Sequence, residues 1–261
     1  MYRGPHKYYD SEAGKKYAED VQRIINELKQ EGKAPAVFIC ETLLGVGGQI
    51  PLPPNYLKKV YSYVRAVGGV CIADEVQVGF GRVGDKFWGF ELQDVVPDIV
   101  VMGKPIGNGH PLAAVVVSNE IADAFNNGME YFNTFGGNPV SMAAGLAVLD
   151  IIEQEEMQQH ARTTGNYLMD GLKKLMNKYP LISDVRGHGL FIGAEMVKDK
   201  ITLEPAVEEI NKVVEEMKDR GFLLSTDGPL NNVLKIKPPL VFSKKNAKDM
   251  IKNLDDVLAQ F

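Results

Sequence analysis

The feature that most constrains this chain is an alternation, in its N-terminal half, of short continuous apolar runs with longer amphipathic segments. A short apolar run without polar gaps is typical of a strand buried on both faces, whereas apolar residues at helical spacing predict an amphipathic helix. Strands that alternate with helices predict a mainly parallel sheet. The expected strands are 36–40, 70–73, 98–102 and 112–117, and the expected helices are about 11–31, 56–67 and 120–125.

The pattern changes near Glu155, which we take as a domain boundary. With 261 residues the chain is longer than a typical single domain, so a large core with one smaller domain is expected. We predict an α/β large domain over 1–155 and an α+β small domain over 156–261. The elements expected around and beyond the boundary are helices at 139–154 and 157–178, two later helices, a turn at 186–190 and short strands near 189–195, 222–225 and 233–236.

Composition narrows the class of protein. A net charge of -5 and a pI near 5.5 provide no basic field for a polyanion, which argues against nucleic acid as a partner. The first ten residues lack the apolar core of a signal peptide and no run reaches the roughly 20 apolar residues of a membrane span, so we expect a cytosolic protein. Cys40 and Cys71 lie in apolar stretches and are expected to be buried thiols, and His6 and His160 have no metal-ligand spacing.

Three ionisable residues follow three of the predicted strands: Glu41, Asp74 and Lys104. In sheets of this kind ligands bind outside the carboxyl ends of the strands. A carboxylate at one strand end is more often a turn or cap group, but three such residues at corresponding places predict a shared site.

Lys104 stands between an apolar strand and a loop rich in glycine and proline, 103–110. Partial desolvation there would disfavour its ammonium form and free an amine for Schiff-base formation. The alternative is a surface lysine beside a structural turn. The loop 133–139 precedes a helix, so Thr134 and nearby amides could meet an anion, or could form only a turn and a helix cap.

Taken together, the motifs resemble the class III aminotransferase family. The resemblance covers nearly the whole chain and rests on Ala73–Arg82 (ADEVQVGFGR), on Met102-Gly103-Lys104 and on Asn133–Pro139 (NTFGGNP), in that order and with family-like spacing. It implies an α/β fold of the fold-type I class, here the C-terminal part of the large domain together with the small domain, and pyridoxal 5'-phosphate (PLP) as the cofactor.

The resemblance also implies roles for individual residues. Lys104 forms the Schiff base with PLP, and Asp74 keeps the ring nitrogen protonated, so that the ring accepts electrons. Val76 packs on one face of the ring, Gln77 binds near the ring hydroxyl, and Thr134 reaches the cofactor phosphate of a neighbouring subunit. A small-molecule amine is therefore expected as the substrate, and a homodimer with a shared active site as the assembly.

The reaction branch stays open between transamination and elimination. Segments 103–111, 225–229 and 233–239 look most like the phospho-lyase branch, which acts on phosphoethanolamine or phosphorylated hydroxylysine. Lys235 stands where family aminotransferases usually carry an arginine. The lysine ammonium is a point charge and cannot bind a carboxylate through two parallel hydrogen bonds as a guanidinium does. It could pair with Glu41 or grip a substrate, or be an exposed residue of an edge strand. His110 could act on a leaving phosphate or merely cap its loop.

Family enzymes carry a longer N-terminal portion, with a loop for the cofactor phosphate and an aromatic residue that stacks on the ring. Neither has a counterpart here, so we expect a fragment whose strands near Ala36 and Val70 expose apolar faces. A non-catalytic fragment or pseudoenzyme subunit that associates with a complete partner is the alternative function. A nucleotide-binding oxidoreductase is disfavoured because no Gly-x-Gly-x-x-Gly turn follows a strand.

Overall fold

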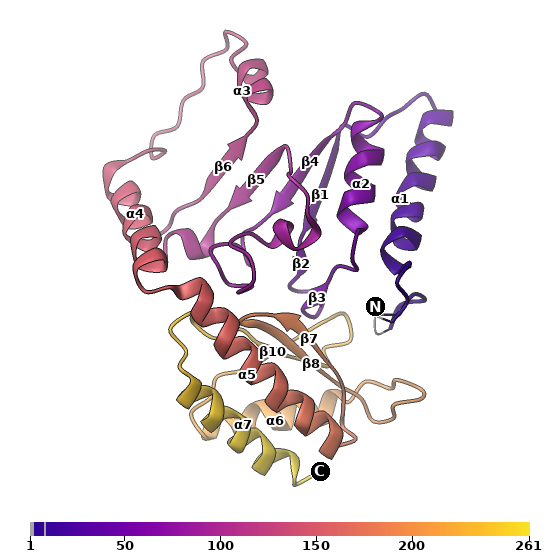
Figure 1. The fold of residues 1–261 in the computed structure, drawn as a ribbon, viewed down its shortest axis with the longest axis vertical. Coiled ribbons are helices and arrows are strands. Elements are labelled where there is room, and N and C mark those ends of the chain that lie inside the picture. Colours follow the sequence, from indigo (N-terminus) through magenta and orange to yellow (C-terminus); the bar gives the residue numbers. More distant parts are fainter. Residues whose placement is uncertain (1–2, 8) are drawn as a thin grey trace.

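A computed structural model describes residues 3–7 and 9–261 of the chain. It contains a four-stranded sheet flanked by helices, and below it in Figure 1 a second four-stranded sheet with its own helices. The first sheet has the order β1-β4-β5-β6, in which β1, β4 and β5 are parallel and β6 is antiparallel to β5. Its elements are α1 (Ala13–Gln30), β1 (Val37–Glu41), α2 (Tyr56–Arg65), β4 (Val70–Asp74), β5 (Ile99–Met102) and β6 (Ala114–Val117).

The mainly parallel sheet predicted from the alternation of elements is confirmed. Shorter elements fill the connections, and a long helix leads out of the sheet. These are β2 (Leu43–Leu44), β3 (Ile50–Pro51), the 3-10 turns η1 (Gly89–Gln93) and η2 (Lys104–Ile106), α3 (Asn119–Phe125) and α4 (Pro139–Gln154).

The second sheet has the order β7-β8-β10-β9 and is antiparallel throughout. Helices α5, α6 and α7 pack on it around a continuous apolar core that includes Leu168, Ile192 and Leu254. The predicted boundary near Glu155 falls between α4 and α5. The elements are α5 (Met157–Lys178), β7 (Ile182–His188), β8 (Phe191–Met196), α6 (Val207–Asp219), β9 (Ser225–Asp227), β10 (Val233–Ile236) and α7 (Lys244–Leu258).

Two details of this second part differ from the prediction. Residues 186–188 belong to β7, a strand that the sequence did not indicate, rather than to a turn. Arg186 explains the difference, because its buried guanidinium lies 2.7 Å from both Asp184 and Glu195, and these ion pairs let polar residues occupy a buried strand. The strand expected at 222–225 begins only at Ser225.

The apolar run of β1 predicts a strand buried on both faces, but in the structure one face of β1 is exposed. Phe38 and Cys40 face the core formed by α1 and α2, whereas Val37 and Ile39 are 47% and 59% exposed. Alternation along the strand turns the second pair to the opposite face of the sheet. The exposed apolar face expected near Ala36 is therefore present.

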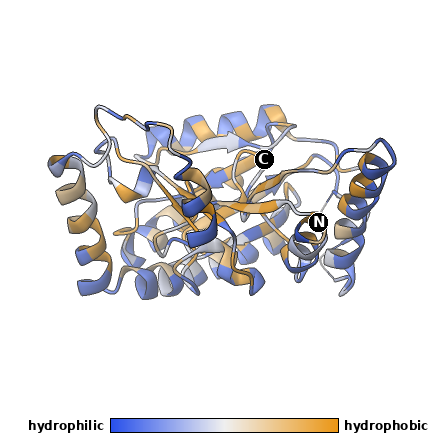
Figure 2. Ribbon diagram, turned by 90° about the horizontal axis from the view of Figure 1, so that it is seen from above, coloured by the Kyte–Doolittle hydropathy of each residue, from blue (hydrophilic) through white to orange (hydrophobic). Residues whose placement is uncertain are grey.

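Helix α4 lies at the end of the molecule opposite α1 and carries hydrophobic segments in Figure 2. Several of its apolar side chains are exposed, among them Val140 and Leu146. Among the described residues, none of the helices combines the length and the apolar character needed to cross a membrane.

Candidate active site

The predicted strand-end residues do meet at one edge of the first sheet. Glu41 is the register partner of Asp74, and Asp74 is the register partner of Val101 on β5. Lys104 begins the turn η2 that directly follows β5. The three ionisable residues thus stand at the carboxyl ends of three adjacent parallel strands, where a ligand-binding crevice is expected.

Lys104 has an unusual backbone conformation. Its φ of 41° lies in the left-handed region, which costs a non-glycine residue conformational energy and is concentrated at functional sites. The prediction that the strand and loop desolvate its side chain is wrong for this structure, since Lys104 is exposed. The neighbouring Gly103 and Gly107 have no side chains that could cover it.

Asp74 and Val76 form the surface between β4 and this lysine turn. The Asp74 Oδ1 accepts a hydrogen bond from the Val76 backbone N–H at 3.0 Å, and no described cation lies within 4.0 Å of the half-buried carboxylate. A Cβ placed on Gly103 would stand 3.4 Å from Val76 Cγ1. An unpaired carboxylate, an apolar side chain and an amine thus follow one another along the edge.

Gln77 connects the two parts of the molecule. Lys237 Nζ, beyond β10, donates a hydrogen bond to Gln77 Oε1 at 2.9 Å. Because an ammonium can only donate, the amide oxygen must face Lys237, and Gln77 Nε2 is left near Gly45, 2.7 Å from where a Cβ would stand. Glu41 Oε2 accepts from the Gly45 N–H at 2.9 Å, so Gln77 and Glu41 approach the same glycine.

Glu75 is a buried residue of this site that the sequence analysis passed over. Its side chain is fully inaccessible and accepts hydrogen bonds from Gly89 N at 2.8 Å, Phe90 N at 2.9 Å and the Thr42 hydroxyl at 3.0 Å. Burial raises its pKa to about 7, against the lowering effect of these donors. Glu75 fastens the segment after Asp74 to the turn at η1. The sequence feature that could have pointed to Glu75 is its place directly after Asp74 at the end of a strand.

We expect Glu75 to make unfolding pH-dependent. Its pKa is about 7 in the folded chain, against an ordinary value of 4.5, so the folded state favours the protonated carboxyl. Its contribution to stability is complete below pH 4.5 and is lost as pH rises through 7. Denaturant unfolding of wild type and Glu75→Gln should therefore show the wild type losing up to about 3 kcal/mol relative to the variant over this range.

A constant difference between the two proteins across that pH range, or one that grows in favour of the wild type as pH rises, would contradict the assignment. The glutamine keeps the size of the side chain, but its amide nitrogen cannot accept the hydrogen bonds that reach one of the two carboxylate oxygens. That loss is the same at every pH, so the pH-dependent part of the difference reports the titrating proton.

Lys235 does not pair with Glu41. Its Nζ lies 2.9 Å from Asp227 Oδ2, and Gln49 Nε2 donates to the same oxygen at 2.7 Å. The edge-strand interpretation is also wrong, because β10 lies between β8 and β9. The charge of Lys235 is therefore balanced within the second part of the molecule.

Thr134 and His110 are not brought to the carboxylates. Thr134 is exposed in the segment between α3 and α4, which Figure 1 shows running outside the sheet. His110 Nε2 lies 2.8 Å from Ser141 Oγ and ties the lysine loop to α4, which supports its structural interpretation. Among the described residues, no group of three or more His, Cys, Asp or Glu side chains could hold a metal ion.

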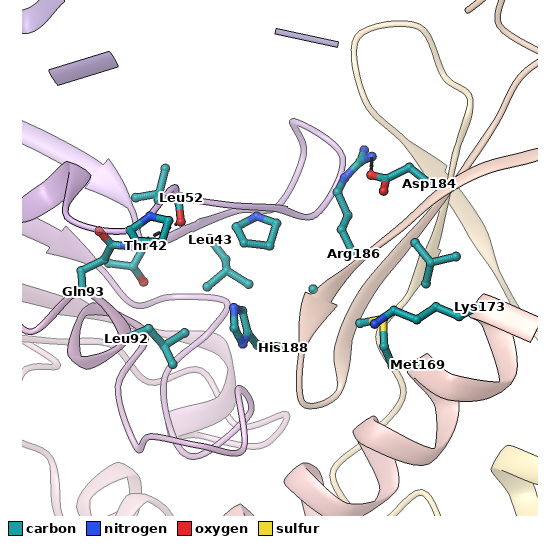
Figure 3. Close-up of a pocket in the computed structure, with 14 residues that line it drawn as sticks. Thr42, Leu43, Leu52, Leu92, Gln93, Met169, Lys173, Asp184, Arg186 and His188 are labelled. Carbon is teal, nitrogen blue, oxygen red and sulfur yellow. Dashed lines mark hydrogen bonds and ion pairs between the residues drawn. The ribbon is translucent and has the colours of Figure 1, made fainter. Parts of the chain in front are cut away.

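A cavity of about 460 Å³ is lined by residues of both parts of the molecule. Figure 3 shows Thr42, Leu43 and Leu92 on one side, Lys173 and Asp184 on the other, and His188 close to Leu43 and Leu92. None of the predicted site residues lines it.

Known proteins of similar sequence and structure belong to the family that the sequence motifs resemble. The family model described as aminotransferase class-III matches residues 4–258. The chain is 48% identical over 246 residues to the "Alanine--glyoxylate aminotransferase 2-like" protein of Drosophila melanogaster, covering 94% of this chain and 50% of that protein. It is 43% identical over 270 residues to "Ethanolamine-phosphate phospho-lyase homolog 1" of Caenorhabditis elegans, covering 99% and 58% respectively.

A solved structure of similar fold is a phospholyase from Arthrobacter in complex with phosphoethanolamine. It superposes with a TM-score of 0.92 at 39% sequence identity, covering 97% of this chain and 61% of that one. The chain therefore spans about half the length of the curated relatives it matches.

Proposed function

This chain belongs to the class III aminotransferase family, whose members are PLP-dependent enzymes, and from that premise we propose that it carries PLP on Lys104 and acts on a primary amine or amino acid. The observation that carries the proposal is the juxtaposition of Asp74 and Lys104 at the carboxyl ends of adjacent strands, with Val76 between them.

The residues present fit this cofactor. The Asp74 carboxylate has no cationic partner among the described side chains and can hold a protonated ring nitrogen. Val76 offers an apolar surface to a ring, and Gln77 Nε2 is a donor turned away from the contact of its oxygen with Lys237. Lys104 supplies the amine, in an exposed position that a carbonyl can reach.

When bound, PLP supplies an electron sink for the carbon that bears the substrate nitrogen. The chain's own residues do the rest. Lys104 Nζ would hold the cofactor, and the same amine would serve as the general base for the carbon that bears the substrate nitrogen. Asp74 would keep a ring nitrogen protonated, and Val76 would offer an apolar contact to the ring.

We favour elimination of phosphate from a phosphorylated amine over transamination. One support is that Lys235 is paired with Asp227 and is not an arginine that could bind a substrate carboxylate. The other is that a 43% identical relative is named a phospho-lyase. A 48% identical relative is named an aminotransferase, so the test has to separate the two reactions.

The assay supplies phosphoethanolamine to the PLP-loaded protein. We expect phosphate and ammonia to be released together without a keto acid. Amine exchange that requires a keto acid and releases no phosphate would overturn the preference for the lyase reaction.

A homodimer with a shared active site is also proposed. Exposed apolar residues gather on α4 and in the preceding segment, among them Met129, Phe132 and Phe135 beside the exposed Thr134. A second copy would bury this surface and place Thr134 against the partner's cofactor phosphate. Light scattering should give twice the mass of the chain, and a monomer at micromolar concentration would contradict this.

We also propose that the protein resides in the cytosol. The feature behind it is the pair of free cysteines, Cys40 and Cys71, which is typical of a reducing compartment. Imaging of the tagged protein in its own cell tests it, and a mitochondrial signal would overturn it.

A further inference from the structure

Lys237 is a cation that the roles described above leave unexplained. It follows β10, is half-buried, and its Nζ lies 5.5 Å from the centroid of the buried Phe191 ring. Its hydrogen bond goes to a neutral acceptor, Gln77 Oε1, at 2.9 Å. Within the described ranges 3–7 and 9–261, no carboxylate oxygen lies within 4.0 Å of it.

The charges around Lys237 are mostly of its own sign. Burial is the first cause that lowers its pKa to about 8, and the positive charges of Arg82, Lys104 and Lys235 lower it further. Asp227 opposes them, but it is already 2.9 Å from Lys235. The proposed cofactor lysine and Lys237 thus share one region of excess positive charge.

A partly buried cation without an anion is costly unless a ligand supplies the opposite charge. The surroundings have room for one, since Lys235, Lys237 and Ser225 are the polar residues that line a cavity of about 380 Å³ whose other walls are mostly apolar. Lys237 also touches Gln77 directly, so an anion held there would belong to a molecule at the candidate active site.

We propose that Lys237 is a specificity-determining residue that binds the anionic, phosphate-class substituent of the amine substrate. Lys235 does not share this role, because it stays paired with Asp227. This rests on the proposed function, because it assigns part of the substrate to the same site. Lys237 therefore selects phosphorylated amines over amines that carry no anionic group, and its hydrogen bond to Gln77 sets its position across the two parts of the molecule.

The test measures the dissociation constants of phosphoethanolamine and of ethanolamine by calorimetry in the protein without PLP, because the PLP-loaded protein is expected to turn phosphoethanolamine over. Wild type should prefer phosphoethanolamine. In Lys237→Met this preference should fall by roughly tenfold to a hundredfold, as for the loss of a charge-assisted contact. Lys237→Arg should keep the preference, and Lys248→Met, which removes an exposed lysine of α7, should leave it unchanged.

The pH dependence gives a second readout. With a pKa of about 8, Lys237 is charged below that pH and loses its charge above it, so the preference of wild type should decline as pH rises past 8. Lys237→Arg stays charged and should show no such decline. Melting temperatures of all variants establish that each is folded.

The proposal would be overturned if wild type bound the two amines equally well. It would also be overturned if Lys237→Met kept the wild-type preference; weaker PLP binding in that same variant would then assign the cation to the cofactor phosphate. Failure of the proposed function itself is seen separately, as a lack of covalent PLP on Lys104, while the measurement without PLP still reads the anion preference.

Discussion

Lys104→Ala is expected to lower kcat/KM by at least about a thousandfold, because it removes both the attachment point of the cofactor and the general base. The loss should not come from unfolding. Lys104 is exposed, so its removal should change the free energy of unfolding by no more than about 0.5 kcal/mol. Steady-state kinetics and denaturant unfolding measure the two effects.

Two additions make the Lys104 result specific. A small primary amine in the buffer should restore part of the activity, since it replaces the missing base. Lys252→Ala, which removes another exposed lysine on α7, should retain full activity. Activity of Lys104→Ala near the wild-type value would show that another lysine does the chemistry.

Asp74→Asn should lower kcat by roughly 100-fold, the usual cost of removing one preorganised electrostatic group at a reacting centre. The amide cannot hold a proton on the ring nitrogen as the carboxylate does. Its oxygen can still accept the 3.0 Å hydrogen bond from Val76 N–H, so the local backbone should be preserved. Turnover and PLP affinity are measured together.

The matched control for this variant is Asp249→Asn, an exposed carboxylate of α7. It should behave as wild type. If Asp74→Asn also kept its turnover, the carboxylate would have no part in the reaction and the assignment of the ring nitrogen to this edge would fail.

The sequence predicts the elements whose signals are local. Helix α4 has the bounds predicted for it, because Asn138 caps it through Ser141 N and Pro139 occupies its first turn. Asp74 and Lys104 could be placed at one edge because parallel strands end on the same side of a sheet.

Features that depend on distant parts of the chain could not be predicted in this way. The contact of Lys237 with Gln77 joins residues 160 positions apart. Strand β7 carries Arg186, whose burial depends on Glu195 of the neighbouring strand. Lys235 follows the same rule, since its partner Asp227 is supplied by β9 and no pattern in the sequence favours that carboxylate over Glu41.

The central claim is that Lys104 is the lysine that holds PLP. The most direct test incubates the protein with PLP, reduces the adduct with borohydride and maps the modified peptide by mass spectrometry. The structure predicts one major label, on Lys104, which disappears in Lys104→Ala and remains in Lys237→Met. A major label on any other lysine would contradict the account.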